Sequence, residues 1–226
     1  MHNGPPAVQV LVPVKPLTDS KLRLATLLTP AERAEFTLRM LEDVLANLAA
    51  TPNIANVAVV SSDPDILHLA RRRDARVIVE AAGSPPSADA LNEALAFAAG
   101  QLPGATPLMV VPGDVPLVDS TTYAAAIEAW PDGIGAVRSH DGGTNALLSP
   151  QPGAIPYRFG AGSLELHRAV AAARQLPFHI LEYPLWARDI DSPDDLVWLA
   201  QQGRRCSSAK FAEQLLVAKD ILKRSA

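Results

Sequence analysis

The sequence predicts an α/β fold with a mostly parallel sheet flanked by helices, and three observations lead to this prediction. Residues 8–14 form a run that is apolar apart from Gln9, as expected for a strand that is covered on both faces. Strand-like and helix-like segments alternate through the first half of the chain, which implies right-handed crossovers between parallel strands. This alternation breaks after residue 133. We therefore expect a small antiparallel piece inserted into the sheet.

The first long helix has the clearest start signal. Thr29 is typical of an N-cap, Pro30 suits the first helical position, and Glu32 completes a capping box. Apolar side chains then recur at helical spacing from Phe36 to Leu48. This pattern predicts a helix that buries one face against the sheet.

The remaining elements follow in order from the same two periodicities. Further strands are predicted at residues 57–60, 76–79, 108–111, 134–138, 146–149 and 178–181. Helices are predicted over residues 65–73, from Ser87 to about residue 99, over 120–130, and after Ser163 and Ser192. A separate amphipathic helix is expected at 210–223. Residues 1–226 thus form one domain, with a helical extension from about residue 205.

Composition excludes several classes of protein. The formal net charge of −4 gives no broad basic surface, so nucleic acid is not expected as a partner. Cys206 is the only cysteine, which excludes an internal disulfide and fits a reducing cytosol. No apolar run is long enough to span a membrane, and the start of the chain lacks a signal-peptide pattern. We expect a cytoplasmic enzyme or binding protein without membrane contact.

Three carboxylates lie where strands of such a sheet end. Asp114 follows a buried strand, and Gly113 before it permits a close backbone approach. Asp189 and Asp191 flank Ile190, so in an extended segment both carboxylates share one face while Ile190 points to the core. Oxygen ligands of this kind suit Mg²⁺. The sequence predicts a metal site here, with a solvated acidic turn as the alternative.

A cationic loop follows the first strand. Lys15 lies between two prolines, and Lys21 and Arg23 come shortly after it. Lysine acts as a point charge and arginine as a bidentate fork toward phosphate. Although single lysines on loops are usually only solvated, the flanking prolines favour a fixed loop. We expect these side chains to bind a nucleotide triphosphate.

Two glycine-containing turns predict a second site, for an anion. Gly160 and Ser163 stand at the start of a helix, where backbone N–H groups meet the positive end of the helix dipole. Thr144 and Asn145 follow a glycine pair at the start of a strand, so their side chains are available for an acidic ligand. The alternatives are an ordinary helix cap and a hairpin turn. His167 is more often a packed or surface histidine than a ligand.

Two further polar side chains are candidates for contacts with the nucleotide. Ser62 follows the second strand, and Asn92 lies on the helix expected after Ser87. Either side chain could recognise a base or a ribose, although neither signal is specific by itself.

Taken in order, these segments resemble the guanylyltransferase family of coenzyme F-420 biosynthesis, over roughly residues 8–200. The segments that carry the resemblance are 13–17 with Lys21 and Arg23, 91–92, 112–117, 143–145, 158–163 with His167, and 189–196. Two small departures, Leu22 between the basic residues and Gly113, remove no charge and no ligand. The region after Cys206 lies outside the resemblance and has no assigned role.

The resemblance implies a Rossmann-like nucleotidyltransferase fold of the nucleotide-diphospho-sugar transferase type. It further implies transfer of GMP from GTP to a phosphorylated three-carbon acid, 2-phospho-L-lactate or phosphoenolpyruvate, with release of pyrophosphate. Asp114, Asp189 and Asp191 would hold Mg²⁺, while Thr144, Gly160 and Ser163 would contact the acid. The spare helix at the end of the chain is compatible with a homodimer, and the pathway implies a downstream transferase as a partner.

Several other functions stay open at this stage. The same chemistry on 3-phospho-D-glycerate is one, and a molybdopterin or sugar-phosphate nucleotidyltransferase is another, although those usually carry a glycine-rich loop after the first strand. A glycosyltransferase that binds metal through Asp-x-Asp is weaker, because residues 189–191 lie late in the chain. A non-catalytic nucleotide sensor is the alternative of a different class. Fold alone does not separate these.

Overall fold

The computed structural model describes residues 7–80, 89–202 and 206–222, and its centre is a seven-stranded sheet in the order β3-β2-β1-β4-β6-β5-β7. The strands are β1 (Val8–Pro13), β2 (Ile54–Ser61), β3 (Arg76–Val79), β4 (Leu108–Val110), β5 (Ile134–Arg138), β6 (Thr144–Ser149) and β7 (Phe178–Leu181). β6 runs antiparallel to β4 and to β5, whereas the other neighbouring pairs are parallel. The predicted mostly parallel sheet with one antiparallel insertion is confirmed.

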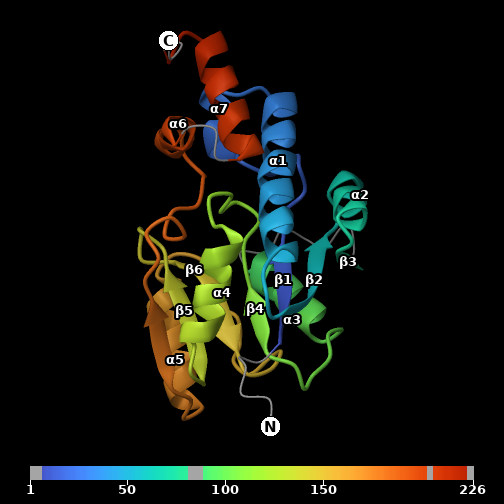
Figure 1. Ribbon diagram of the computed structural model, residues 1–226, viewed down its shortest axis with the longest axis vertical. Coiled ribbons are helices and arrows are strands. Elements are labelled where there is room, and N and C mark those ends of the chain that lie inside the picture. Colours follow the sequence, from blue (N-terminus) through green and yellow to red (C-terminus); the bar gives the residue numbers. More distant parts are fainter. Residues whose placement is uncertain (1–6, 81–88, 203–205, 223–226) are drawn as a thin grey trace.

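Helices cover both faces of the sheet (Figure 1). They are α1 (Pro30–Ala49), α2 (Pro64–Arg72), α3 (Ala90–Ala99), α4 (Ser120–Ala129), α5 (Ser163–Ala173), α6 (Pro193–Gln201) and α7 (Ser207–Ala218), with a short 3-10 helix η1 (Leu22–Thr26). Side chains of α1, α2 and α4 share one buried cluster with the sheet, and those of α3 and α5 share another on the opposite face. The resulting three layers bury the sheet on both sides.

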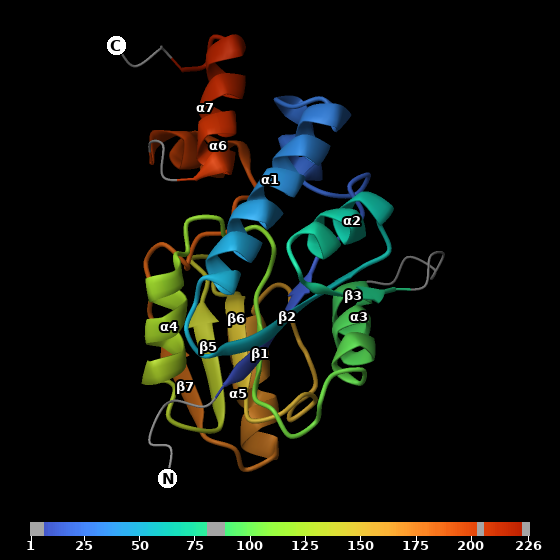
Figure 2. The ribbon, with the colours of Figure 1, turned by 45° about the vertical axis from the view of Figure 1, so that its right-hand side comes forward.

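A third buried cluster, which we call the outer cluster, lies beyond the sheet. It joins η1, the first half of α1, α6 and α7, and includes Leu24, Phe36, Ile190, Leu196 and Leu215. Figure 2 shows α6 and α7 on the side of the molecule where α1 begins, away from the bottom of the sheet. Because the loop after β1 and the segment before α6 both contribute to it, the outer cluster packs behind the carboxyl ends of the strands.

The first long helix begins as its sequence predicts. The Thr29 hydroxyl accepts a hydrogen bond from the Glu32 backbone N–H, and the Glu32 carboxylate accepts one from the Thr29 N–H. Pro30 occupies the first position, and Phe36 and Leu48 are fully buried. The local capping signal and the apolar spacing therefore agree with the tertiary packing.

Two predicted boundaries and one missed element need correction. β2 begins at Ile54, earlier than predicted, because it pairs with β1 along its length. Ser87, the predicted cap of the next helix, lies outside the described residues, and Asp89 stands at the N-cap of α3. The 3-10 helix η1 was not predicted from the sequence.

The last helix is displaced from the predicted 210–223. It begins at Ser207 because Asp43 on α1 accepts hydrogen bonds from the N–H groups of Ser207 and Ser208, at 3.0 and 2.8 Å. It ends at Ala218, shortly before Asp220, whose φ of 57° is left-handed. A cap supplied by another helix leaves no signal in the local sequence, which explains the error.

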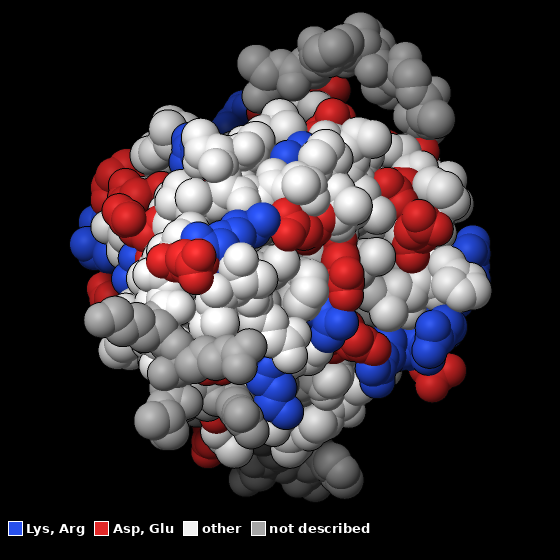
Figure 3. Space-filling view, turned by 90° about the horizontal axis from the view of Figure 1, so that it is seen from above, with Lys and Arg blue, Asp and Glu red and all other residues white. Residues whose placement is uncertain are grey.

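No helix among the described residues is both long and apolar enough to cross a membrane. The face seen from the α6 and α7 end carries acidic and basic side chains interspersed among uncharged residues (Figure 3). This mixed surface agrees with the near balance of charge in the sequence.

Candidate active site

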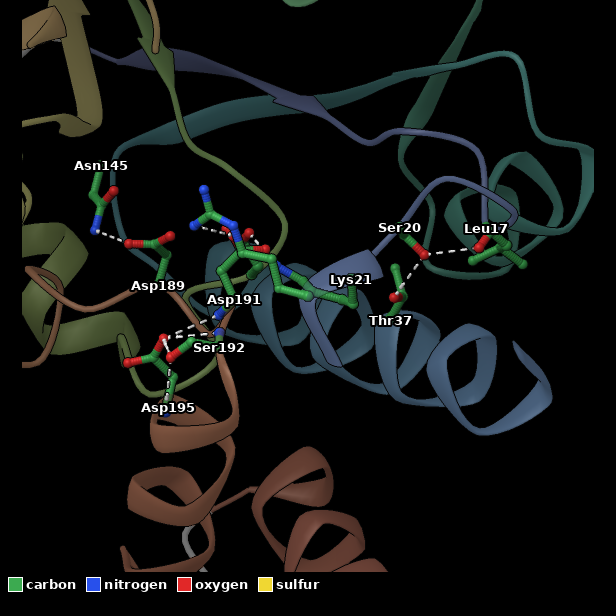
Figure 4. Close-up of polar contacts among 11 residues, drawn as sticks. Leu17, Ser20, Lys21, Thr37, Asn145, Asp189, Asp191, Ser192 and Asp195 are labelled. Atoms are coloured by element: carbon green, nitrogen blue, oxygen red, sulfur yellow. Dashed lines mark hydrogen bonds and ion pairs between the residues drawn. The ribbon is translucent and has the colours of Figure 1, made fainter. Parts of the chain in front are cut away.

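The three predicted carboxylates meet around one ammonium group at the carboxyl edge of the sheet. Lys21 Nζ lies 2.6 Å from Asp114 Oδ2 and 3.5 Å from Asp191 Oδ1. Arg23 reaches Asp191 Oδ2 at 3.0 Å, and Asp189 is close enough to act electrostatically on Lys21. Figure 4 shows Lys21 on the loop after β1 and Asp189 and Asp191 on the segment before α6, while Asp114 follows β4. We call this set the acidic cluster.

Lys21 is built firmly into the loop. Its backbone is left-handed, with φ 52° and ψ 38°, an unfavourable conformation for a residue with a side chain. The preceding Ser20 hydroxyl donates to the Leu17 carbonyl and accepts from the Thr37 hydroxyl, at 3.0 and 3.1 Å, so the turn is tied to α1. Burial works to lower the pKa of Lys21, but Asp114 and Asp191 outweigh it and the pKa is raised. Lys21 therefore stays charged.

The Asp189–Asp191 segment has the predicted geometry. Ile190 is fully buried in the outer cluster, and its backbone N–H donates to the Asp114 carbonyl at 3.1 Å. The two aspartates beside it are only partly buried. One apolar side chain thus anchors the segment and presents both carboxylates toward Asp114.

The helix start that follows needs neither of these aspartates. Ser192 and Asp195 form the capping box of α6, with Pro193 at its first positions. Arg188 donates to Asp195 Oδ1 at 2.7 Å and stacks over the Trp198 ring. Asp189 and Asp191 are therefore free for another task, as the sequence indicates.

Two observations bear on whether the acidic cluster can hold a further cation. Asp114 Oδ1 is buried and has no hydrogen-bond partner. The pKa of Asp189 is raised, first by burial and then by the nearby Asp114 carboxylate. Within the described residues no three acidic, histidine or cysteine side chains stand at metal-binding distances from one another. The donor chemistry fits a divalent ion, but Lys21 now lies among the oxygens.

A β-bulge lies at Asn145 near the start of β6, next to Thr144. The register with β5 pairs Val137 with Ala146 and Arg138 with Thr144, so Asn145 is an extra residue. A bulge re-aims neighbouring side chains. Here it turns Thr144 toward α5 and Asn145 toward Trp186, and the sequence carries no sign of it beyond the glycines before the strand.

Asn145 braces the acidic cluster. Its amide donates to the Trp186 carbonyl at 2.9 Å and to Asp189 Oδ1 at 3.4 Å, while the Trp186 indole N–H donates to the Asn145 carbonyl at 3.0 Å. Trp186 is fully buried against Tyr123. The sequence places Asn145 with the acid substrate, and the structure gives it a contact with a predicted metal ligand. Trp186 was not predicted as part of the site.

Thr144 belongs to a second group, the hydroxyl cluster, formed by Thr144, Ser163 and His167. Ser163 Oγ lies 3.0 Å from Thr144 Oγ1, and His167 Nδ1 lies 3.1 Å from the same oxygen. All three side chains are more than nine-tenths buried. Gly160 and Gly162 beside them have φ values of 132° and 66°, which glycine adopts without strain. The turn brings exposed backbone to the buried hydroxyls.

Three predicted residues, Asn92, Lys15 and Ser62, belong to neither cluster. Asn92 is buried and pairs with the Phe159 backbone, accepting from its N–H at 2.8 Å and donating to its carbonyl at 3.1 Å. Lys15 and Arg23 are exposed, and Ser62 is half-buried after β2. The structure thus brings Lys21, Asp114, Asp189 and Asp191 together directly, and attaches Asn92 to the turn that carries Gly160.

A groove of about 430 Å³ opens between α3 and residues 152–158. Asn92 and Arg158 line it, whereas the three aspartates of the acidic cluster do not. The groove therefore borders the Phe159 turn. It does not mark the place of the reaction, because the acidic cluster lies outside it. The position of the reacting groups follows from the charges at the carboxyl ends of the strands.

Solved structures define the class of fold. A nucleotidyl transferase from Methanothermobacter thermautotroptrophicus matches with a TM-score of 0.63 and 12% identity, covering 87% of this chain and 97% of that one. A protein from Desulfovibrio desulfuricans G20, assigned as a nucleotide-diphospho-sugar transferase, matches with a TM-score of 0.71 and 15% identity, covering 96% and 98%. These likenesses show that the chain has the nucleotide-diphospho-sugar transferase fold.

Sequence relatives narrow this class to one family. The family model described as guanylyl transferase, CofC like, matches residues 8–225, so the chain belongs to this family. A phosphoenolpyruvate guanylyltransferase from Roseiflexus sp. (strain RS-1) is 37% identical over 94% of this chain and 93% of that protein. Another from Rubrobacter xylanophilus is 39% identical over 87% and 95%. The resemblance drawn from the motifs is confirmed, and the match extends through α7.

Proposed function

We propose that this enzyme transfers GMP from GTP to phosphoenolpyruvate, with release of pyrophosphate, in coenzyme F-420 biosynthesis. The observation that carries the proposal is its family membership, with relatives of that activity at 37% and 39% identity over most of the chain. The acidic cluster supports it, because it combines cations with carboxylates at the edge where this fold holds ligands. 2-Phospho-L-lactate and 3-phospho-D-glycerate are the competing acids.

The reaction needs no covalent intermediate on the enzyme. An oxygen of the acid's phosphate attacks the α-phosphorus of GTP in line, a new P–O bond forms, and the bond from the α-phosphorus to the bridging oxygen breaks. Pyrophosphate leaves with that oxygen. Because the nucleophile is already an anion, the protein has to position two anions and offset their repulsion.

The cationic residues supply part of that charge. Lys21 is fixed and charged beside Asp114, and Arg23 and Lys15 are exposed near the loop after β1, where a triphosphate can reach them. Mg²⁺ held by Asp114, Asp189 and Asp191 would supply the rest, by neutralising phosphate oxygens. Contacts of Ser62 and Asn92 with the nucleoside stay predictions. Asn92 would also hold the Phe159 turn in place through its hydrogen bond to that backbone.

The hydroxyl cluster supports binding of the acid. Thr144 and Ser163 lie at the N-terminal end of α5, where the helix dipole favours an anion, and Gly160 leaves the adjoining backbone uncovered. Asn145 links this site to Asp189, so the acid and the nucleotide would meet at the start of β6. A cytoplasmic location, a homodimer and a downstream transferase as partner remain predictions.

Pyrophosphate release tests this function. Purified protein is incubated with GTP and Mg²⁺ against phosphoenolpyruvate, 2-phospho-L-lactate and 3-phospho-D-glycerate in parallel, with ATP replacing GTP and with EDTA as controls. We expect release with GTP and phosphoenolpyruvate, abolished by EDTA. Release with another acid alone would change the substrate, and none from folded protein would favour another nucleotidyltransferase substrate or the nucleotide sensor.

A further inference from the structure

The His167 imidazole is the one member of the hydroxyl cluster without an assigned task. It lies on α5 and is 0% exposed. Phe159 packs its ring edge-on at 5.0 Å between centroids, and both ring nitrogens have polar partners. A fully buried imidazole needs a polar partner for each ring nitrogen, and which of these partners donates fixes the state of the ring.

The two contacts determine where the imidazole proton lies. Nε2 is 3.0 Å from the backbone nitrogen of Arg158, which can only donate. Nε2 must therefore accept and carries no hydrogen. In a neutral ring the hydrogen is then on Nδ1, which donates to Thr144 Oγ1 at 3.1 Å. Burial, followed by the charge of Arg158, lowers the pKa of His167 to about 4, so the ring is neutral near pH 7.

Because Thr144 accepts a hydrogen bond from His167, one of the two hydroxyl hydrogens of Thr144 and Ser163 is left without an acceptor in the part of the chain that the structure describes. Thr144 Oγ1 accepts from His167, and Thr144 and Ser163 share a single contact with each other at 3.0 Å. Two hydroxyls hold two hydrogens, and their mutual contact uses one. The contacts of the described residues give the other no acceptor. Without the imidazole donor, the spare hydrogen could turn toward the histidine position instead.

We propose that His167 is a positioning residue: by donating to Thr144, it directs the spare hydroxyl hydrogen of the Thr144–Ser163 pair toward the anionic acid substrate. The inference rests on the proposed function, since that acid is the ligand. It explains why a neutral ring is held at this place. A carboxylate or phosphate offers only acceptors, so a pair that presents a donor binds it and a pair that presents a lone pair repels it.

Two substitutions of His167 each keep one of the ring's two hydrogen bonds and remove the other. The amide nitrogen of asparagine can replace Nδ1, so His167→Asn keeps a donor for Thr144. The amide oxygen of glutamine can replace Nε2, so His167→Gln keeps the acceptor for the Arg158 N–H and loses the donor. His179→Gln, at a half-exposed histidine in β7 that pairs with Asp132, is the matched control.

The measurement is the KM for phosphoenolpyruvate and for GTP, with kcat, for each variant. We expect His167→Gln to raise the KM for the acid about tenfold while the KM for GTP changes less than about twofold. His167→Asn should stay within about threefold of the wild type, and His179→Gln should match it. Equal effects of the two His167 variants on both substrates would show a purely structural role and overturn the proposal.

The tautomer gives a second test that does not depend on turnover. Nitrogen NMR of ¹⁵N-labelled wild-type protein distinguishes a hydrogen on Nδ1 from one on Nε2. A hydrogen on Nδ1 is expected, and a hydrogen on Nε2 would overturn the inference even if every variant folded poorly. An enzyme inactive with all three acids would contradict the proposed function, while the NMR result would still decide the proton arrangement.

Discussion

The acidic cluster and the hydroxyl cluster lie at the same edge of the sheet but are stabilised in opposite ways. The acidic cluster gathers charges that repel one another, leaves Asp114 Oδ1 without a partner and depends on Lys21. The hydroxyl cluster is neutral and buried, and its imidazole is bonded through both nitrogens. The first is suited to receiving cations and phosphates, whereas the second is already ordered. An enzyme that joins two anions can use both properties.

The two clusters are joined through adjacent residues of one strand. Thr144 belongs to the hydroxyl cluster, and Asn145 contacts Asp189 in the acidic cluster. The bulge in β6 separates them, because without the extra residue the register would place the rest of the strand on the wrong faces. The comparison therefore predicts that charge changes act on turnover and stability, and hydroxyl changes on acid binding.

The largest effect is expected from Asp114→Asn. Removal of this charge should lower kcat at least about a hundredfold while the protein stays folded, because a carboxylate central to the charge arrangement is lost. Turnover with GTP and phosphoenolpyruvate measures it, with circular dichroism for the fold. Asp119→Asn is the matched control, since Asp119 only caps α4. Normal turnover in Asp114→Asn would remove the acidic cluster from the mechanism.

Lys21→Met tests whether the cluster depends on its internal cation. Loss of a buried charge partner should lower the free energy of unfolding by about 3 kcal/mol, because Asp114 then has no cationic partner and Asp191 keeps only the exposed Arg23. Mg²⁺ should raise the Tm of this variant more than that of the wild type, as it can take the place of the ammonium. Arg23→Gln, at a side chain 77% exposed, should change stability by less than about 1 kcal/mol. Equal Tm shifts with Mg²⁺ in the variant and the wild type would argue against Mg²⁺ binding at the position of the Lys21 ammonium group.

Thr144→Val tests the role of the hydroxyl cluster in binding the acid. Valine keeps the shape and removes the hydroxyl, so we expect the KM for the acid to rise about tenfold with little change in the KM for GTP. Steady-state kinetics with each substrate varied in turn measures both. A rise confined to GTP would place the hydroxyl cluster on the nucleotide instead.

The last prediction concerns pH and the buried imidazole. The pKa of His167 is lowered to about 4 in the folded protein. As the pH falls below about 6.5, the histidine is therefore protonated in the unfolded chain while it stays neutral in the folded protein. Stability is therefore lost on acidification, by about 2 kcal/mol from this group between pH 7 and pH 5. Denaturant unfolding at both pH values should show this loss, and His167→Asn should lack that part of it. Identical pH dependence in both proteins would contradict a neutral buried ring.

Much of the fold follows from local sequence. Thr29, Pro30 and Glu32 determine where α1 begins, and the apolar runs identify the strands, because capping and burial periodicity act over a few residues. The site residues Asp114, Asp189 and Asp191 could also be selected, since Ile190 alternates with carboxylates and Ser192 and Asp195 already account for the helix cap.

Other features were decided only by tertiary structure. Asp43 caps α7 from another helix, the bulge at Asn145 depends on pairing with β5, and Lys21 acquires its carboxylate partners from distant segments. The two nitrogens of His167 likewise find their partners on a strand and a loop. The sequence alone determined which chemical groups are present and which local elements form, because those depend on neighbouring residues. Which groups meet, and therefore which are charged, neutral or left with a free donor, was decided by the packing of segments far apart in the chain.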